Sequence, residues 1–156
     1  MLAEGRKKEK VMTLANLVVL KIEDVMSREV LTASEEDAVF PAVIKMHELG
    51  VGAIVVLDKA KHVTGIFTER DLMVKVVVPE KDPKKTCIAD AMTKRPQALS
   101  SDMPILRAFQ LLQSGSFRHV PVVDDGKLVG ILSVRDLHRL VYDFMELVYD
   151  FLGRKR

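Results

Sequence analysis

The chain has 156 residues, a length that suits one compact domain or two small domains that share a core. Its 24 basic and 22 acidic residues leave a formal net charge of +2, so charge alone does not indicate a nucleic-acid partner. One cysteine excludes an internal disulfide framework and a cysteine-rich zinc site, and the apolar run nearest the start, Leu17 to Leu20, is far too short to span a membrane, so we expect a cytoplasmic protein.

Residues 1–21 combine a charged segment with an apolar pattern. Residues 4–10 read EGRKKEK, and the four basic residues among them oppose the dipole of a helix that begins there. The apolar residues that follow have the spacing of an amphipathic helix: Val11, Leu14, Ala15 and Val18. We expect this helix to fray at its start. Contact of the basic stretch with nucleic acid or another acidic partner is a less favoured alternative.

Residues 22–78 form a first repeat of strands and helices. Short runs of β-branched and aliphatic residues indicate the strands, and apolar residues at helical spacing indicate the helices. The predicted elements are a strand over 30–32, a helix from 36 or 37 to 49, strands over 54–57 and 63–67, and a helix that begins at Thr68. Pro41 fits this arrangement because it lies near the first turn of its helix, where a missing amide is tolerated.

A predicted linker over residues 79–86, PEKDPKKT, leads to a second repeat over residues 87–142. Its predicted elements are a strand over 97–99, a helix over 103–114 with Pro104 in its first turn, strands over 120–123 and 128–132, and a final helix. Each repeat therefore has the order β-α-β-β-α, which gives a three-stranded sheet with helices on one side. Since neither sheet can bury its apolar face alone, we expect an α/β (α+β) fold in which the two repeats pack together.

The final helix continues as an extension over residues 143–156. The sequence LVYDF occurs at 140–144 and again at 147–151, which places apolar residues along one stripe at spacings of four and three. The stripe comprises Leu140, Phe144, Leu147 and Phe151, and beside it run Val141, Met145, Val148 and Leu152. Two explanations remain open: this face packs within the chain, or it forms a helix-to-helix contact in a homodimer.

The most informative motif occurs where a strand passes into a helix. GIFTERD, which ends at Asp71, and GILSVRD, which ends at Asp136, both contain S/T-x-x-D. In this pattern a hydroxyl and a carboxylate satisfy the free amides of the first helical turn, so capping boxes are the simplest interpretation of Thr68 and Ser133. Exposed amides at the positive end of a helix also attract phosphate, and Arg135 adds a guanidinium at the second junction.

The two motifs belong to a tandem duplication of the chain. A shift of 66 residues superposes Ile22, Asp24, Met26, Ser34, Ala42, Val56 and Asp58 on Ile88, Asp90, Met92, Ser100, Ala108, Val122 and Asp124. After one deleted residue the shift becomes 65, and Gly65, Ile66, Arg70, Asp71 and Leu72 meet Gly130, Ile131, Arg135, Asp136 and Leu137. The likeness therefore covers the repeats as a whole and not the motifs alone.

This duplication resembles the CBS-domain family, named after cystathionine β-synthase. The motifs that carry the resemblance are DVMS at 24–27, DAMT at 90–93, FRHVPVVDD at 117–125, and the pair GIFTERD and GILSVRD. The chain looks like a stand-alone protein with one tandem CBS pair, often called a Bateman module, over about residues 22–142. The resemblance implies two copies that face each other about a pseudo-twofold axis. It also implies two clefts that commonly hold adenine nucleotides (AMP, ADP or ATP) or S-adenosylmethionine.

The resemblance also implies roles for residues of this chain. The nucleotide-binding residues carried over by position are Val30, Ile66, Thr68, Asp71, Arg95, Pro96, Arg118, His119, Pro121, Ile131, Ser133, Arg135 and Asp136. The two aspartates would accept hydrogen bonds from ribose hydroxyls, and the two capping hydroxyls would donate to phosphate or ribose. Arg118 and His119 would reach toward phosphates. The backbone at 29–30 and at 95–96 would face the adenine edge, with the two isoleucines as its apolar floor.

The two repeats differ where a phosphate would be bound. Gly52 and Ala53 in the first repeat occupy the positions of Arg118 and His119 in the second, so the first repeat places no positive charge there. We therefore expect the cleft that contains Asp136 to bind ligand better than the cleft that contains Asp71. Because the resemblance implies intertwined copies, we expect that the two basic residues can serve either cleft.

These patterns predict a regulatory sensor and not an enzyme. The four histidines have no metal-ligand spacing, and no nucleophile elbow or Walker-type loop is present. We expect an adenine nucleotide or S-adenosylmethionine as regulatory ligand, no required cofactor, a homodimer, and an unidentified target protein whose activity the ligand biases. The alternatives are a structural or dimerisation module without a ligand, in which both motifs are only caps, and, less favoured, a nucleic-acid-associated regulator.

Overall fold

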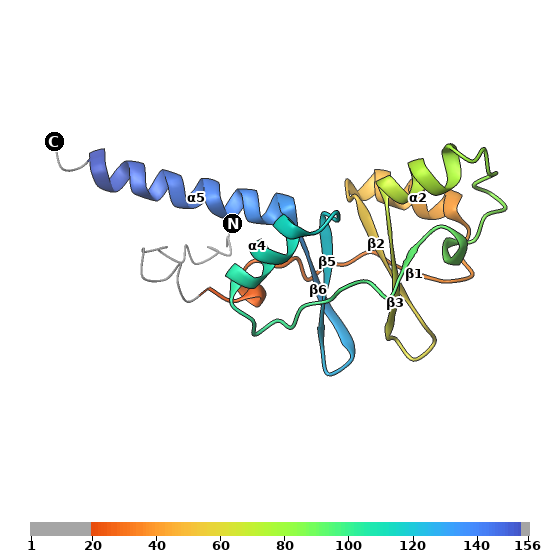
Figure 1. Ribbon diagram of the computed structural model, residues 1–156, viewed down its shortest axis with the longest axis horizontal. Coiled ribbons are helices and arrows are strands. Elements are labelled where there is room, and N and C mark those ends of the chain that lie inside the picture. The colour runs from red at the N-terminus through yellow and green to blue at the C-terminus, as the bar shows by residue number, and fades with distance from the viewer. Residues whose placement is uncertain (1–19, 154–156) are drawn as a thin grey trace, which may run out of the picture.

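The computed structural model describes residues 20–153. The predicted amphipathic helix over 11–18, with the basic stretch before it, lies outside the described residues. The fold combines helices and strands, as the sequence predicts, and the two halves of the chain lie side by side (Figure 1). Each half has strands at its centre and helices packed against them.

The first half is built on a four-stranded sheet with the order β1-β2-β3-β4. β1 (Thr32–Ser34) is parallel to β2 (Ala53–Leu57), and β3 (Val63–Thr68) and β4 (Thr93–Lys94) extend the sheet in antiparallel register. Helix α2 (Val39–Leu49) connects β1 to β2. Helix α3 (Glu69–Leu72) follows β3 directly and continues into the π-helical turn η2 (Met73–Val77).

The second half has a two-stranded antiparallel sheet of β5 (His119–Asp124) and β6 (Lys127–Ser133). Helix α4 (Ile105–Ser114) precedes these strands, and the long helix α5 (Val134–Gly153) follows them. Two short 3-10 turns begin the repeats: η1 (Ile22–Asp24) and η3 (Ile88–Asp90). Figure 1 shows that α5 continues beyond the strands and helix of its own half.

The repeats exchange their first residues. Ile22 N donates to Met103 O at 2.9 Å, so η1 is bonded to the second half of the chain. In the same way Ile88 N donates to Asp37 O at 2.8 Å, so η3 is bonded to the first half. The exchange extends into the sheets, because β4 pairs with β3 and Ser27 forms a bridge with Ile131 of β6.

Each hydrophobic core therefore contains residues from both repeats. The first core consists of Val39, Ala42, Met46, Ile54, Val56, Phe67 and Val76 together with Ile88, Ala91 and Met92. The second consists of Leu99, Ile105, Ala108, Leu112, Val120, Val122, Leu132, Leu137 and Leu140 together with Leu20, Ile22 and Met26. Because each repeat fills part of the other core, burial of apolar surface couples the two halves.

The predicted linker is packed against a helix. The first amides of α2 have no side-chain cap, and Val39 N and Phe40 N instead donate to the carbonyls of Thr86 and Pro83, each at 2.9 Å. The first amide of the equivalent helix α4 also bonds to a backbone carbonyl outside the helix, since Ile105 N donates to Leu20 O at 2.9 Å. The segments that connect the repeats thus satisfy helical amides that would otherwise lack partners.

Some predicted element bounds differ from the structure. β1 lies two residues later than the predicted strand over 30–32, and the predicted strand over 97–99 is reduced to one bridge between Leu99 and Val122. That ladder ends early because Ser101 N donates to the Asp124 side chain at 2.9 Å instead of a strand carbonyl. Pro104 precedes α4 as its N-cap and does not lie within the first turn.

Candidate functional site

The first strand-to-helix junction is a closed capping box at the end of β3. Thr68 N and Thr68 Oγ1 both donate to Asp71 Oδ2, at 3.0 and 2.7 Å. Asp71 N donates back to Thr68 Oγ1 at 3.3 Å. The motif therefore caps α3 as the residue pattern predicts.

The second junction repeats this geometry at the end of β6. Ser133 N and Ser133 Oγ donate to Asp136 Oδ2 at 2.7 and 2.6 Å, and Asp136 N donates to Ser133 Oγ at 3.3 Å. In both junctions one carboxylate oxygen is committed to the cap. Any interaction of these aspartates with a ligand must use the other oxygen.

The two junctions differ at that other oxygen. Asp71 Oδ1 accepts a hydrogen bond from Thr93 Oγ1 at 3.2 Å and forms an ion pair with Lys75 Nζ at 2.7 Å. Within the described part of the chain, Asp136 Oδ1 has no hydrogen bond or ion pair. Asp71 is 7% exposed, whereas Asp136 is only half-buried. The carboxylate of the second junction is therefore the one that still has acceptor capacity.

The exchanged segments place backbone groups beside each junction. Ile66 pairs with Thr93 between β3 and β4, and Arg95 N donates to Thr64 O at 3.0 Å. The backbone of Arg95 has a φ of +48°, and its side chain is exposed. Thr93 thus lies next to Ile66 near the first junction, and Arg95 lies beside Thr64, farther back along β3.

The corresponding contacts at the second junction come from the first repeat. Ser27 N and Ile131 N donate to each other's carbonyl oxygens, both at 2.9 Å. Ser27 Oγ also donates to Glu29 O at 3.3 Å. Val30 follows this segment and is half-buried, as are Ile131 and Pro96. Pro121, which pairs with Ile131 across β5 and β6, is buried.

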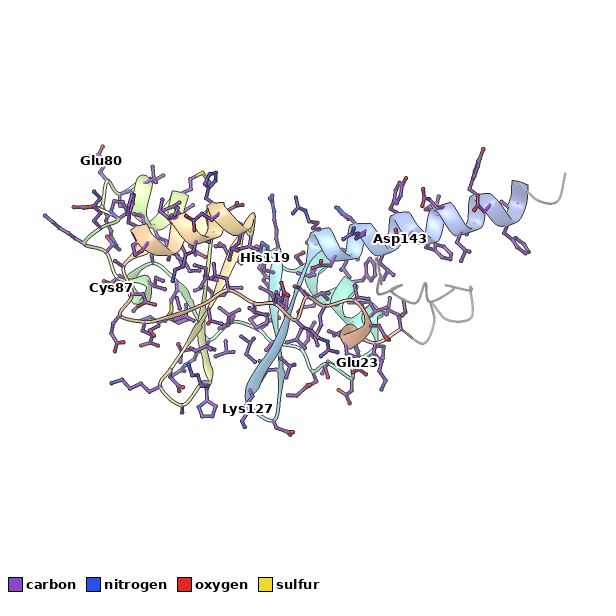
Figure 2. The ribbon with its side chains drawn as sticks, turned by 180° about the vertical axis from the view of Figure 1, so that it is seen from behind. Glu23, Glu80, Cys87, His119, Lys127 and Asp143 are labelled. Carbon is purple, nitrogen blue, oxygen red and sulfur yellow. The ribbon has the colours of Figure 1, made fainter. Side chains whose placement is uncertain are left out.

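His119 lies at the boundary between the two halves (Figure 2). It begins β5 opposite Ser133, and burial lowers the pKa of its imidazole because the charged form loses hydration. The negative charges of Glu69 and Asp136 act in the opposite direction on this pKa, and the charge of Arg118 lowers it further. A basic side chain of the second repeat is therefore within electrostatic reach of acids from both repeats.

Gly52, the residue of the first repeat that is aligned with Arg118, lies close to His119. A Cβ atom placed on Gly52 would be 3.3 Å from both Glu69 Oε2 and His119 Cε1. Arg70 Nη1 also crosses between the halves and donates to Ser116 O at 3.1 Å. The two junctions thus face each other, with Arg118 exposed at their edge and Arg135 exposed on α5.

Sequence reasoning missed three residues of this region: Glu69, Lys75 and Thr93. The repeat comparison held a signal for two of them, because Glu69 is aligned with Val134 and Lys75 with Leu140. Such charged-to-apolar differences between copies mark places where the two junctions have different surroundings. Thr93 could not be found in this way, since only the exchange of segments brings it to Asp71.

A separate pocket of about 270 Å³ lies between α4 and α5. Its walls are the apolar residues Leu20, Pro104, Ile105, Leu106, Phe109, Leu140, Val141 and Phe144. Because none of the described residues that line it is charged, this pocket offers no partner for a phosphate. Among residues 20–153, no cluster of three acidic, histidine or cysteine side chains could hold a metal ion, and no helix is long and apolar enough to cross a bilayer.

Comparison with known families and proteins agrees with the duplicated architecture. The family model for the CBS domain matches residues 22–78 and again residues 88–143. A Bacillus subtilis protein is 35% identical over 75% of this chain and 79% of its own length. A Methanopyrus kandleri protein and a mitochondrial CBS-domain-containing protein of Arabidopsis thaliana are each 34% identical over 76% and 71% of this chain. The match spans 61% and 56% of the length of these two relatives.

Solved structures show the same arrangement. A CBS-domain-containing protein from Agrobacterium tumefaciens has a TM-score of 0.72 and 31% identity, over 78% of this chain and 98% of its own. A CBS-domain pair solved with 5′-methylthioadenosine and S-adenosylmethionine has a TM-score of 0.73 over 80% of this chain and 98% of its own. At 22% identity, this second likeness concerns the fold alone.

Proposed function

The chain belongs to the CBS-domain family, and from this premise we propose that it is a ligand-sensing regulatory module that binds an adenosine-containing ligand at its second junction. CBS pairs are regulatory modules, and the ligand proposed here is an adenine nucleotide or a sulfonium or thioether derivative of adenosine. The observation that carries the proposal is the open carboxylate oxygen of Asp136. An ionised carboxylate oxygen with free lone pairs can accept hydrogen bonds from the vicinal hydroxyls of ribose.

The charges around Asp136 support the same site. Arg118 is exposed beside His119 and its carbonyl accepts from Val134 N at 3.0 Å, and His119 is within electrostatic reach of Asp136. A guanidinium offers paired donors to phosphate oxygens, and the N–H of a neutral imidazole adds another donor. The related CBS pair that was solved with 5′-methylthioadenosine and S-adenosylmethionine supports adenosine as the common part of the ligand.

Calorimetric titration with AMP, ADP, ATP, S-adenosylmethionine and 5′-methylthioadenosine tests this proposal. At least one of these ligands should bind, and Asp136→Asn should weaken it at least tenfold while Asn keeps an acceptor for the cap. Asp143→Asn, an exposed acid farther along the same helix, is the matched control and should leave the affinity unchanged. Equal affinity in Asp136→Asn and the wild type would exclude this site.

The charge of the ligand can be assigned with one further variant. Arg118→Gln should weaken binding of the nucleotides but leave 5′-methylthioadenosine unaffected, because the latter carries no phosphate. If the protein prefers the uncharged ligand and ignores the Arg118 substitution, the basic residues do not serve a phosphate. The result therefore separates nucleotide sensing from sensing of sulfur-containing adenosine derivatives.

The proposal includes a homodimer formed through α5. Beyond the second core the helix keeps several large apolar side chains exposed: Val141, Tyr142, Met145, Tyr149, Phe151 and Leu152. Spacings of four and three residues along the helix let the same face of a second chain pack against it. Ligand at the junction would then bias how the two chains meet, and an unidentified partner protein would respond to that arrangement.

A structural module without a ligand is the second candidate function. Both S/T-x-x-D motifs are closed capping boxes, and the Asp71 carboxylate is fully used within the chain. This candidate predicts that none of the five adenosine ligands binds. It also predicts that Arg118→Gln and Asp136→Asn change nothing except the stability of the fold.

A further inference from the structure

We propose that Lys75 keeps the first junction closed, so that each chain binds one adenosine ligand and not two. This inference rests on the proposed function of the second junction and concerns the stoichiometry of binding. Equivalent aspartates stand at the two junctions, but the structure gives them unequal freedom to accept new hydrogen bonds. Lys75 and Thr93 both occupy the second oxygen of Asp71, and Lys75 is the charged partner of the two.

The acceptor positions of Asp71 are all taken. A carboxylate offers about four lone-pair positions. At Asp71 these face four donors, namely Thr68 N, Thr68 Oγ1, Thr93 Oγ1 and Lys75 Nζ. At Asp136 the cap provides two donors, Ser133 N and Ser133 Oγ, both to Oδ2. A ribose therefore finds a free acceptor at the second junction and an occupied one at the first.

The lysine is itself held in place. Lys75 Nζ lies 2.7 Å from Asp71 Oδ1, 3.0 Å from Met92 O and 3.3 Å from Thr93 Oγ1. An ammonium group has three donors, and three acceptors surround this one. Two of them belong to the exchanged segment of the second repeat. The lysine thus joins the repeats and covers the carboxylate at the same time.

Displacement of this lysine by a ligand would be unfavourable. The Asp71 side chain is 9% exposed, so removal of its cationic partner leaves a buried charge. Neutral ribose hydroxyls form weaker hydrogen bonds to a carboxylate than an ammonium does. At the second junction the aligned residue is Leu140, which is buried in the second core and offers no cation to Asp136. Binding there displaces no partner from the aspartate.

Titration calorimetry of the full chain measures the number of sites directly. With the adenosine ligand that binds the wild type best, we expect one site per chain. Lys75→Leu places the second-repeat residue in the first repeat and should raise this number to two. Addition of Asp71→Asn to that variant should return it to one, which identifies the new site as the first junction. Lys59→Leu, an exposed lysine in the turn between β2 and β3, is the matched control and should keep one site.

The outcomes separate this inference from the proposed function. Two sites in the wild type, one of them lost in Asp71→Asn, would overturn the role of Lys75 while the proposed function stands. One site in Lys75→Leu, with a fold intact by circular dichroism, would also overturn it. Binding by Lys75→Leu alone, abolished by Asp71→Asn, would support the role of Lys75 and overturn the proposed site at Asp136. No binding by either protein would overturn both. Lys75→Gln, which retains a polar side chain without charge, replaces Lys75→Leu if the latter does not fold.

Discussion

At the scale of single residues, Asp71 and Asp136 show how one motif serves two purposes. Both cap the helix that follows them, but Asp71 also binds Lys75 and Thr93 and so connects the repeats. Among residues 20–153, Asp136 has only the hydrogen bonds of its cap, and it remains half-buried near His119. The first junction therefore contributes mainly to stability, and the second retains the polar capacity that a ligand needs.

The stability of two single variants should reflect this difference. Asp71→Asn removes a charged acceptor from Lys75 and Thr93 and should lower the free energy of unfolding by about 2 kcal/mol. Asp136→Asn keeps an oxygen for the cap and should cost less than about 1 kcal/mol. Urea denaturation followed by circular dichroism measures both values. Equal losses in the two variants would show that the ion pair adds nothing to the stability of the first junction.

His119 should make stability depend on pH. Burial holds its pKa below the usual histidine value of about 6.5, so below that pH the unfolded chain binds more protons than the folded one. Its contribution to stability should therefore fall as pH decreases from about 6.5 to the pKa in the folded state, and it should not change below that pKa. The nearby charges of Glu69 and Asp136 reduce the effect, and that of Arg118 increases it.

Comparison with His119→Gln isolates this contribution from that of the other histidines. Between pH 7.5 and 5.5 the wild type should lose more unfolding free energy than the variant, as measured by urea denaturation at each pH. Identical pH dependence of the two proteins would mean that His119 titrates alike in the folded and unfolded chains.

Residue patterns could predict the caps but not the neighbours of the caps. Thr68 with Asp71 and Ser133 with Asp136 are three residues apart, so local geometry decides their contacts. Thr93 is 22 residues from Asp71, and its contact depends on which strand the exchanged segment joins. The proximity of His119 to the charges of Glu69 and Asp136 also depends on how the two repeats are placed. Such contacts follow from the topology and not from the local sequence.

At the scale of elements, the exchanged segments explain the glycine that begins each motif. A Cβ atom on Gly130 would lie 2.5 Å from Met26 Sδ and 2.9 Å from Ser27 O. On Gly65 it would overlap Met92 Sδ, and its close neighbours there belong only to that methionine side chain. Only glycine lets the segment from the other repeat cross the strand at these distances.

Substitution of the two glycines should have unequal effects. Gly130→Ala meets the backbone of Ser27 and should destabilise the protein by about 3 kcal/mol, whereas Gly65→Ala meets a flexible side chain and should cost about 1 kcal/mol. Thermal denaturation of both variants tests the order. A larger loss for Gly65→Ala would contradict it. The conservative variant Met26→Leu in the Gly130→Ala background should not restore stability if the backbone contact dominates.

Helix α5 should determine the oligomeric state. Met145 and Leu152 lie seven residues apart on the helix and are 59% and 61% exposed. Met145→Glu with Leu152→Glu should convert a homodimer into a monomer, because two carboxylates would be buried in the contact. Sedimentation velocity gives the mass, and Asp143→Arg, a charge change elsewhere on the exposed helix, is the control. A dimer that survives the double substitution would show that α5 is not the contact.

Element positions were predictable where hydrophobic patterns were long. The strands around the two hairpins and the final helix agree with the predicted ranges, because buried β-branched runs and a sustained helical stripe give strong signals. The strand predicted over 97–99 was wrong as a strand, since only Leu99 is paired, and the pairing does not continue past it because the Asp124 side chain accepts a hydrogen bond from the amide of Ser101. A side-chain competitor of this kind leaves no mark on hydrophobic periodicity.

At the scale of the whole molecule, the boundaries of the two sequence repeats do not coincide with the boundaries of the two hydrophobic cores. The repeats begin at about residues 22 and 88, yet Ile22 is buried in the second core and Ile88 in the first. The sequence could reveal the repeats and predict that they pack together. The family resemblance implied intertwined copies, but the residue pattern alone could not show that each repeat begins inside the other, because a pattern of apolar residues does not specify which sheet they cover.

This exchange should make the chain unfold as one unit. Phe67 is fully buried in the first core, where Met92 of the second repeat is also packed. Loss of that core would release β4 and η3, and with them the hydrogen bonds of Lys75 to Met92 O and Thr93 Oγ1 that join the two repeats. A ligand bound at the second junction should for the same reason stabilise both halves, which is the property that a sensor requires.

Differential scanning calorimetry tests the coupling. The wild type should show one transition with equal calorimetric and van't Hoff enthalpies. Phe67→Leu removes volume only from the first core and should shift the single transition to a lower temperature, with a loss of about 1 kcal/mol, without creating a second one. Two separate transitions, with only one displaced by the substitution, would show that the halves unfold independently. In that case the exchanged segments would not transmit ligand binding from one half to the other.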